Sequence, residues 1–178
     1  MRIKLNASGI ILYFDVSYYS KTTKDTWDEE WCRTDGAIVS RFMNYRLGNK
    51  ILMSQEVDAL VDLFTRQVNG EMQQKEKFSC VEPDLTFICY PVTDLRNDPK
   101  YAYVRPGWEL QDIKFELVVG FWDSNRAFTD NAIHLMYNRE DIECLLCYLR
   151  YVRKELKEDD PQVIALIAKG VFEPEREK

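Results

Sequence analysis

Five cysteines are the residues of this 178-residue sequence with the most obvious capacity for metal or redox chemistry. They are Cys32, Cys80, Cys89, Cys144 and Cys147. Cys144 and Cys147 have the Cys-x-x-Cys spacing of zinc ligands, and four thiolates are enough to bind zinc. Both lie in the middle of a predicted helix among leucines, however, where no turn presents them to a metal. Because free cysteine behaves as a small buried hydrophobe, we predict core packing, no metal and no cofactor. A metal or redox role for Cys80, Cys89, Cys144 and Cys147 remains the alternative.

The single histidine, His134, is the next candidate for chemistry. One histidine excludes catalytic designs that need two, and it excludes a histidine-rich metal site. His134 alternates with Ile133 and Leu135 in a predicted strand, which favours a structural or surface imidazole. Nucleotide-binding glycine motifs and the nucleophile-elbow motif are absent from the sequence. We therefore predict no catalytic residues; the alternative is an enzyme that uses carboxylates and His134 on a small substrate.

Carboxylates gather in one polar segment, residues 20–30, which we call the acidic loop. Its chemistry-bearing residues are Asp25, Trp27, Asp28, Glu29 and Glu30. Acids beside tryptophans occur in sugar-binding and glycosidase sites, but adjacent loop carboxylates are most often a solvated surface. A tryptophan ringed by negative charge also suits a protein-binding epitope for a basic partner. From these residues alone, a solvated surface, a partner-binding site and a catalytic role all stay open.

The overall charge narrows the class of partner. The sequence has 24 Lys and Arg against 30 Asp and Glu, a net charge of −6. Such a chain repels phosphate backbones, which argues against nucleic-acid binding. The sequence has no apolar run long enough to span a membrane, and Asp15 interrupts the apolar stretch 10–16 where a signal peptide would need continuity. We expect a cytoplasmic protein without a membrane partner.

The order of predicted elements indicates an α+β fold with a mostly antiparallel sheet. Two main helices are expected to pack on the sheet, with a short helix after them at the C-terminus. The first helix has apolar residues at helical spacing over 57–68, with Ser54 as its predicted N-cap. The second begins at Asn138, which forms a predicted capping box with Asp141. Predicted strands cover 2–19 as a hairpin, then 31–46, 77–81, 85–92, 108–122 and 132–137.

The simplest partition is one α+β domain over residues 1–157 and a C-terminal helical extension with a charged tail over 158–178. The extension begins at Asp160, with Pro161 at the first helical position, and its helix ends at Gly170. Its adjacent apolar residues, among them Val163 and Ile164, indicate a helix that covers the core. The alternative is an adaptor or phage-related interaction module in which this helix docks on a partner.

Several segments in this order resemble the WapI-type immunity proteins of bacteria. They are Trp27-Asp28-Glu29-Glu30-Trp31 before a strand that runs to Tyr45, the helix Glu56 to Val68, the hairpin Phe78 to Phe87 with its Glu82-Pro83-Asp84-Leu85, the strand to Phe121, and a closing helix with Leu145, Leu146 and Leu149. The resemblance covers residues 10–155. The sequence departs from the family pattern in its long segment 91–113 and in the helix after Asp160.

The resemblance implies a non-catalytic antitoxin that binds and neutralises a cognate polymorphic toxin in the cytoplasm. The partner would be the toxin domain, and the residues implied to meet it are the five named in the acidic loop. The sequence leaves the identity of the toxin and the order of the strands open. It also leaves a homodimer open, because exposed strand edges are able to pair.

Overall fold

The computed structural model describes residues 1–21, 30–95, 99–101, 111–123, 125 and 127–174. Over these residues it contains three α-helices and two main antiparallel sheets, so the predicted α+β class is confirmed. The helices are α1 (Ser54–Val68), α2 (Arg139–Val152) and α3 (Pro161–Ala168). A short 3-10 turn, η3, covers Pro99–Tyr101.

One sheet has five strands in the order β11-β1-β2-β3-β4. Their bounds are β11 (Phe172–Glu173), β1 (Arg2–Ala7), β2 (Ile10–Ser17), β3 (Arg33–Val39) and β4 (Asn44–Arg46). The other sheet has four strands in the order β10-β9-β6-β5. Their bounds are β10 (Phe128–Asn138), β9 (Lys114–Trp122), β6 (Leu85–Cys89) and β5 (Glu76–Ser79). A separate two-stranded ladder pairs β7 (Thr93–Asp94) with β8 (Gln111–Asp112).

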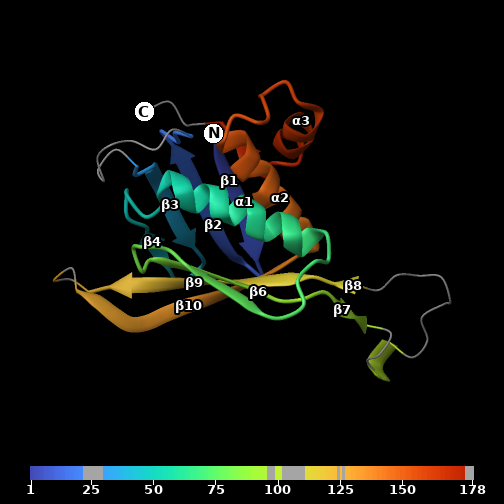
Figure 1. The fold of residues 1–178 in the computed structure, drawn as a ribbon. Helices are drawn as coiled ribbons and strands as arrows, with labels where there is room; N and C mark the ends of the chain where they lie inside the picture. The colour runs from blue at the N-terminus through green and yellow to red at the C-terminus, as the bar shows by residue number, and fades with distance from the viewer. Residues whose placement is uncertain (22–29, 96–98, 102–110, 124, 126, 175–178) are drawn as a thin grey trace.

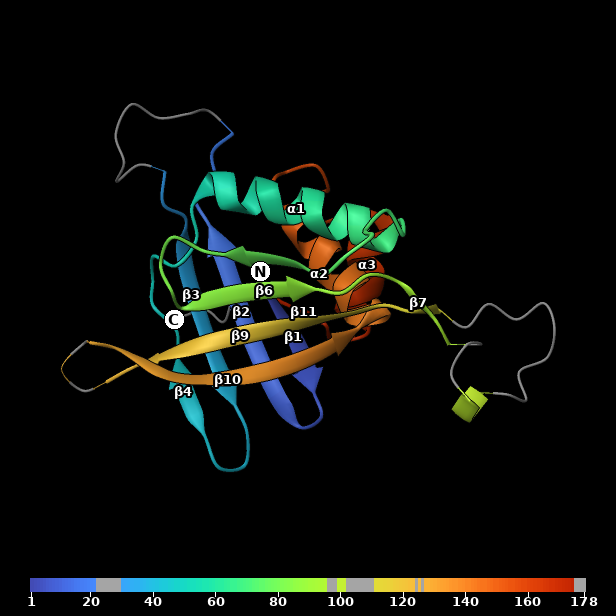
Figure 2. The same ribbon diagram turned by 60° about the horizontal axis from the view of Figure 1, so that its bottom comes forward.

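The four-stranded sheet lies along the bottom of the view in Figure 1, and the five-stranded sheet, α1 and α2 lie above it. In Figure 2 the strands of the two sheets cross one another. Aromatic rings join α1 to the four-stranded sheet: Phe64 of α1 meets Phe115 of β9 edge-on at 5.2 Å, and within the sheet Phe115 stacks on Tyr137 of β10 at 4.9 Å. The cluster of buried apolar residues includes members of both sheets and of α1 and α2, so the core sits between the helices and the inner faces of both sheets.

The first helix buries the predicted stripe, including Val57, Leu60 and Phe64. Ser54 is not its N-cap, however; that position belongs to Met53, and Ser54 is the first helical residue. The carboxylate of Glu56 replaces the expected cap by accepting hydrogen bonds from the amides of Met53 (2.8 Å) and Val81 (2.6 Å). The start of α1 is thus tied to the turn between β5 and β6.

The second helix has the predicted capping box. The side chain of Asn138 accepts from the amide of Asp141 at 3.2 Å, and the carboxylate of Asp141 accepts from the amide of Asn138 at 3.1 Å. On its buried side, the Tyr148 hydroxyl accepts from the amide of Val16 at 2.8 Å, which fixes α2 on β2.

Several strand predictions change in extent. The described part of the predicted strand 108–122 divides into β8, which pairs with β7, and β9 of the four-stranded sheet, and the predicted strand 85–92 ends at Cys89. The predicted strand 31–46 is two strands, because the chain turns at 40–43, where the amide of Ser40 donates to the Met43 carbonyl at 2.8 Å. The predicted last strand, 132–137, is longer and covers all of β10, with a register irregularity against β9 between Phe128 and Ala132.

The C-terminal segment begins as predicted, with Asp160 as the N-cap of α3 and Pro161 at its first position. Beyond α3, β11 pairs with β1, and Phe172 is buried against Tyr148. The Arg2 guanidinium donates to the Glu173 carboxylate at 2.9 Å across this pair. Within the described residues, no helix combines the length and the apolar composition needed to cross a membrane.

Candidate functional site

The acidic loop connects β2 to β3, so its ends are set by the five-stranded sheet. Asp25, Trp27, Asp28 and Glu29 lie outside the described residues. Glu30 is described: it is half-buried, and its carboxylate accepts from the Gln55 side-chain amide at 3.3 Å. The structure therefore places one of the five predicted residues, at the first turn of α1.

Ser54 holds both ends of the acidic loop. Its hydroxyl oxygen accepts from the amide of Ser20 at 3.1 Å, and its own amide donates to the Glu30 carbonyl at 2.9 Å. Because Ser54 is buried, these bonds are shielded from competition with water. The residue that the sequence suggested as a helix cap thus closes a loop across the start of the helix instead.

Two consecutive tyrosines lead into the acidic loop with opposite exposure. Tyr19 is buried, and its hydroxyl donates to the Asp58 carboxylate at 2.8 Å. The side chain of Tyr18 is 71% exposed, and its backbone lies in the left-handed region at φ 61°. A residue other than glycine costs roughly 1–2 kcal/mol in that region. This backbone conformation reverses the alternation of inward and outward side chains that runs along β2, so Tyr18 projects into solvent while Tyr19 packs inward.

A groove of about 590 Å³ lies beside these tyrosines, between the end of β2 and the end of α2. Its lining includes Tyr18, Tyr19 and Tyr151, together with Leu156 and Lys157. Aromatic and aliphatic walls with a few charges at the margin suit a segment of another protein. Sequence reasoning placed Tyr18 in the strand of the predicted hairpin, where packing would explain it, and did not predict its exposure, because the left-handed turn that exposes it has no glycine or asparagine signal.

The solvent-facing side of α1 continues the negative charge of Glu30. Asp58 and Asp62 are four residues apart and therefore neighbours on the helix surface. Arg153 of α2 pairs with Asp58 at 3.1 Å, whereas Asp62 is exposed. The described part of this surface thus combines an exposed aromatic ring, acidic side chains and a loop anchored at both ends.

His134 lies elsewhere, on the outer face of the four-stranded sheet. Its Nδ1 is 2.5 Å from the Glu116 carboxylate, which also accepts from the Tyr90 hydroxyl at 2.7 Å. The hydrogen bonds from Tyr90 and then from His134 lower the pKa of Glu116. Sequence reasoning did not find Glu116 or Tyr90, because strands β6, β9 and β10 come together only in the folded sheet. A carboxylate can orient an imidazole in this way for proton transfer, but this pair lies on an open face.

All five cysteines are free and buried, which confirms the predicted core packing. Burial raises the pKa of Cys89 to about 12 and that of Cys144 to about 11. A thiol with so high a pKa is a weak nucleophile and a weak metal ligand at neutral pH. Among the described residues, which include every cysteine and His134, no group of three or more potential ligands is arranged to bind a metal ion.

Comparison with known proteins gives one match. A family model described as the immunity protein WapI-like family matches residues 2–155. A search of curated proteins and a search of solved structures give no match. The matched range includes both sheets apart from β11, both main helices and the acidic loop, and it ends before α3.

Proposed function

Because this chain belongs to the WapI-like immunity protein family, we propose that it binds a cognate polymorphic toxin in the cytoplasm and neutralises it without catalysis. The toxin-binding surface is the acidic loop, with Asp25, Trp27, Asp28, Glu29 and Glu30, extended by Tyr18. We call this set the loop surface.

The anchoring of the acidic loop by Ser54 is the observation that carries the placement. A loop whose two ends are fixed loses less conformational entropy when a partner binds, so more of the contact energy is retained as affinity. Tyr18 lies next to one of these ends. Its backbone is in the strained left-handed conformation, and because its side chain is exposed, packing within the chain does not offset that strain. An exposed tyrosine beside an anchored, charged loop is a typical arrangement for a binding hot spot.

Electrostatics indicates the chemistry of the partner. The chain has a net charge of −6, and the loop surface has four carboxylates close together in sequence. Such a surface attracts a basic protein and raises its association rate at low salt. Toxins that act on polyanions such as nucleic acids have basic active-site clefts, so a basic toxin domain is the expected partner.

Identification of the partner is the first step of the test. The tagged protein is used to capture proteins from its native cytosol at low and moderate salt, and mass spectrometry identifies those that copurify. The toxin domain found in this way is then produced separately. Equimolar wild-type protein should abolish its activity, and failure to inhibit it would refute the antitoxin proposal.

The placement of the site needs its own variants. Replacing Asp25, Asp28, Glu29 and Glu30 together by Ser should slow association by roughly tenfold or more at low salt. The control replaces four acids outside the loop surface, Asp35, Asp130, Glu143 and Asp159, by Ser and makes the same change in net charge. If both variants slow association equally, only net charge matters; if neither does, the loop surface is not the site. Neither result would remove the chain from its family.

An enzyme that uses His134 is the rival function, and the contact between His134 and Glu116 is the observation that favours it. Turnover of a small substrate that is lost in His134→Ala would support the rival. The antitoxin proposal instead expects His134→Ala to inhibit the toxin as well as the wild type does.

A further inference from the structure

The groove between the end of β2 and the end of α2 offers positive charge in a chain that is acidic overall. Its described lining includes the acids Asp15 and Glu158 and the lysines Lys154 and Lys157. Both acids accept hydrogen bonds from tyrosine hydroxyls, Asp15 at 3.3 Å and Glu158 at 3.1 Å. Both lysines are exposed, and among the residues that the structure describes neither has an ion-pair partner. The two ammonium groups are therefore free to pair with an acid from another molecule.

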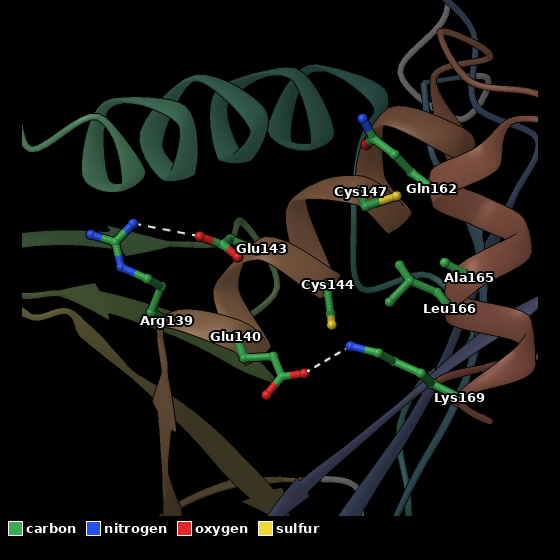
Figure 3. A pocket seen from close by; sticks show the side chains of 9 residues that line it. All are labelled: Arg139, Glu140, Glu143, Cys144, Cys147, Gln162, Ala165, Leu166 and Lys169. Carbon is green, nitrogen blue, oxygen red and sulfur yellow. Dashed lines mark hydrogen bonds and ion pairs between the residues drawn. The ribbon is translucent and has the colours of Figure 1, made fainter.

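The groove between α2 and α3, drawn in Figure 3, differs in this respect. It has a similar volume, about 530 Å³ against about 590 Å³. The charged side chains in its described lining are paired with one another, Lys169 with Glu140 at 3.1 Å and Arg139 with Glu143 at 3.5 Å. These charges balance within the chain, so they select no ligand of either sign.

Lys154 has an unusual backbone conformation for a lysine. The helices α1, α2 and α3 end in the same Schellman motif, in which the first residue beyond the C-cap lies in the left-handed region. In α1 and α3 this residue is Gly70 (φ 73°) and Gly170 (φ 70°), and glycine adopts that region without strain. In α2 it is Lys154 at φ 62°, where the Cβ atom crowds the backbone. The chain thus has a strained lysine at the helix end that borders the groove.

Tyr18 lines the β2 side of the same groove and is strained in the same way. Among the described residues, the left-handed positions without glycine are Ser8, Tyr18 and Lys154, so two of these three line one groove. Both side chains are exposed, so packing within the chain does not offset the strain. Strained residues of this kind concentrate at ligand-binding sites.

Ion pairs and a hydrogen bond hold the groove in shape. Arg153, which precedes Lys154, pairs with Asp58 of α1 at 3.1 Å and with Glu155 at 3.1 Å. Tyr19, on the other wall of the groove, donates to the same Asp58 carboxylate at 2.8 Å. One carboxylate of α1 thus fixes both walls, and a groove fixed in this way loses little conformational freedom when a ligand binds.

We propose that this groove binds an acidic segment of the toxin. An apolar side chain of the segment lies between Tyr18 and Tyr151, and a neighbouring carboxylate pairs with Lys154 and Lys157. This contact, which rests on the proposed function, adds a site of opposite charge beside the loop surface.

Two observations favour the toxin as the occupant. Tyr18 belongs to both the groove and the loop surface, so a partner on the loop surface also borders the groove. Tyr18, Tyr151 and Lys154 lie within the family match over residues 2–155, and Lys157 follows two residues beyond it. A basic toxin also has acidic side chains, and adjacent patches of opposite sign fix the orientation in which it docks.

Lys154→Gly separates binding from folding, because the two expected effects are different. Glycine relieves the left-handed strain, so the melting temperature should stay the same or rise by up to about 4 °C. The dissociation constant for the toxin domain, identified as described above, should rise by about tenfold because an ion pair is lost. The change also makes the chain more negative, which by itself favours a basic toxin, so net charge cannot explain weaker binding. Lys154→Arg keeps the charge and should bind within about threefold of the wild type.

Two variants are matched controls. Lys77→Ser removes an exposed lysine from β5 and makes the same change in net charge as Lys154→Gly. Ser8→Gly relieves the left-handed strain (φ 52°) in the turn between β1 and β2, at the other end of β2 from the groove. Neither control should raise the dissociation constant. Replacement of acids in the toxin domain one at a time should reveal one whose loss weakens binding to the wild type but not to Lys154→Gly.

The outcomes distinguish this proposal from the proposed function. If the wild type inhibits the toxin and Lys154→Gly binds as tightly, only the groove proposal fails. It also fails if Lys77→Ser weakens binding equally, or if no acid of the toxin couples to Lys154. A wild type that does not inhibit the toxin would overturn both proposals. A dimer of the free wild type that Lys154→Gly dissociates in sedimentation velocity would assign the groove to a second copy and overturn the toxin contact.

Discussion

Replacing Ser54 by Ala is the most direct test of the loop anchoring. The change removes the hydroxyl oxygen that accepts from the Ser20 amide at 3.1 Å and leaves the backbone bond from residue 54 to the Glu30 carbonyl in place. A typical intramolecular hydrogen bond contributes about 0.5–1.5 kcal/mol, and a buried donor left unpaired costs about 1–3 kcal/mol. Because Ser20 is half-buried and water can partly replace the lost acceptor, the expected loss of unfolding free energy is about 1–1.5 kcal/mol.

Three measurements follow from that value. The melting temperature should fall by roughly 2–6 °C, since a chain of this length shifts by about 2–4 °C per kcal/mol. Hydrogen exchange at the Ser20 amide should become faster by about fivefold to tenfold, because 1.4 kcal/mol corresponds to a factor of ten in an opening equilibrium. Affinity for the toxin domain should fall by a similar factor or less, as the loop must then be ordered on binding.

Ser40→Ala is the matched control. Ser40 accepts from the amide of Phe42 at 3.2 Å in an exposed turn, so water replaces its hydroxyl at little cost. It should change neither the Ser20 exchange rate nor toxin binding. If Ser20 exchanges at the wild-type rate in Ser54→Ala, the hydroxyl does not anchor the loop, and the reasoning for the placement of the loop surface fails.

Three further predictions address the core, the sheet surface and the strained turn. Tyr148→Phe should lower the unfolding free energy by about 1–3 kcal/mol in chemical denaturation, because the buried Val16 amide loses its acceptor. Glu116 has a lowered pKa, so its stabilising contribution is fully present above the ordinary glutamate pKa and is lost as the pH falls through its folded value. Glu116→Gln should therefore show a smaller loss of stability than the wild type between pH 7 and pH 3; an unchanged pH profile would contradict this. Tyr18→Gly should leave the unfolding free energy unchanged or raise it by up to about 1 kcal/mol, since relief of the left-handed strain is offset by the greater freedom of unfolded glycine. The same variant should bind the toxin domain more weakly, and wild-type affinity would remove Tyr18 from the loop surface.

The acidic loop shows how far local sequence can define a site. Its carboxylates and tryptophan are evident from composition alone, but the bonds from Ser54 to Ser20 and Glu30 join positions 24 to 34 residues apart. The sequence around Ser54 predicted a helix cap, because a serine before a helical stripe usually has that role. Glu56 provides the capping carboxylate instead, which leaves the serine hydroxyl available for the loop.

The sequence by itself determined the two main helices, the capping box of α2, the hairpin of β1 and β2, the buried cysteines and the family. These features depend on spacing within a few residues or on apolar composition, which the chain carries with it into any fold. Only the tertiary structure decided which side of α3 is covered, which carboxylate meets His134 and where the acidic loop is held. Each of these depends on contacts between elements distant in sequence, and periodicity cannot specify those contacts because it describes one element at a time. The exposed apolar surface of α3 illustrates this, because its residues have the composition of a core and too few neighbouring elements to cover them.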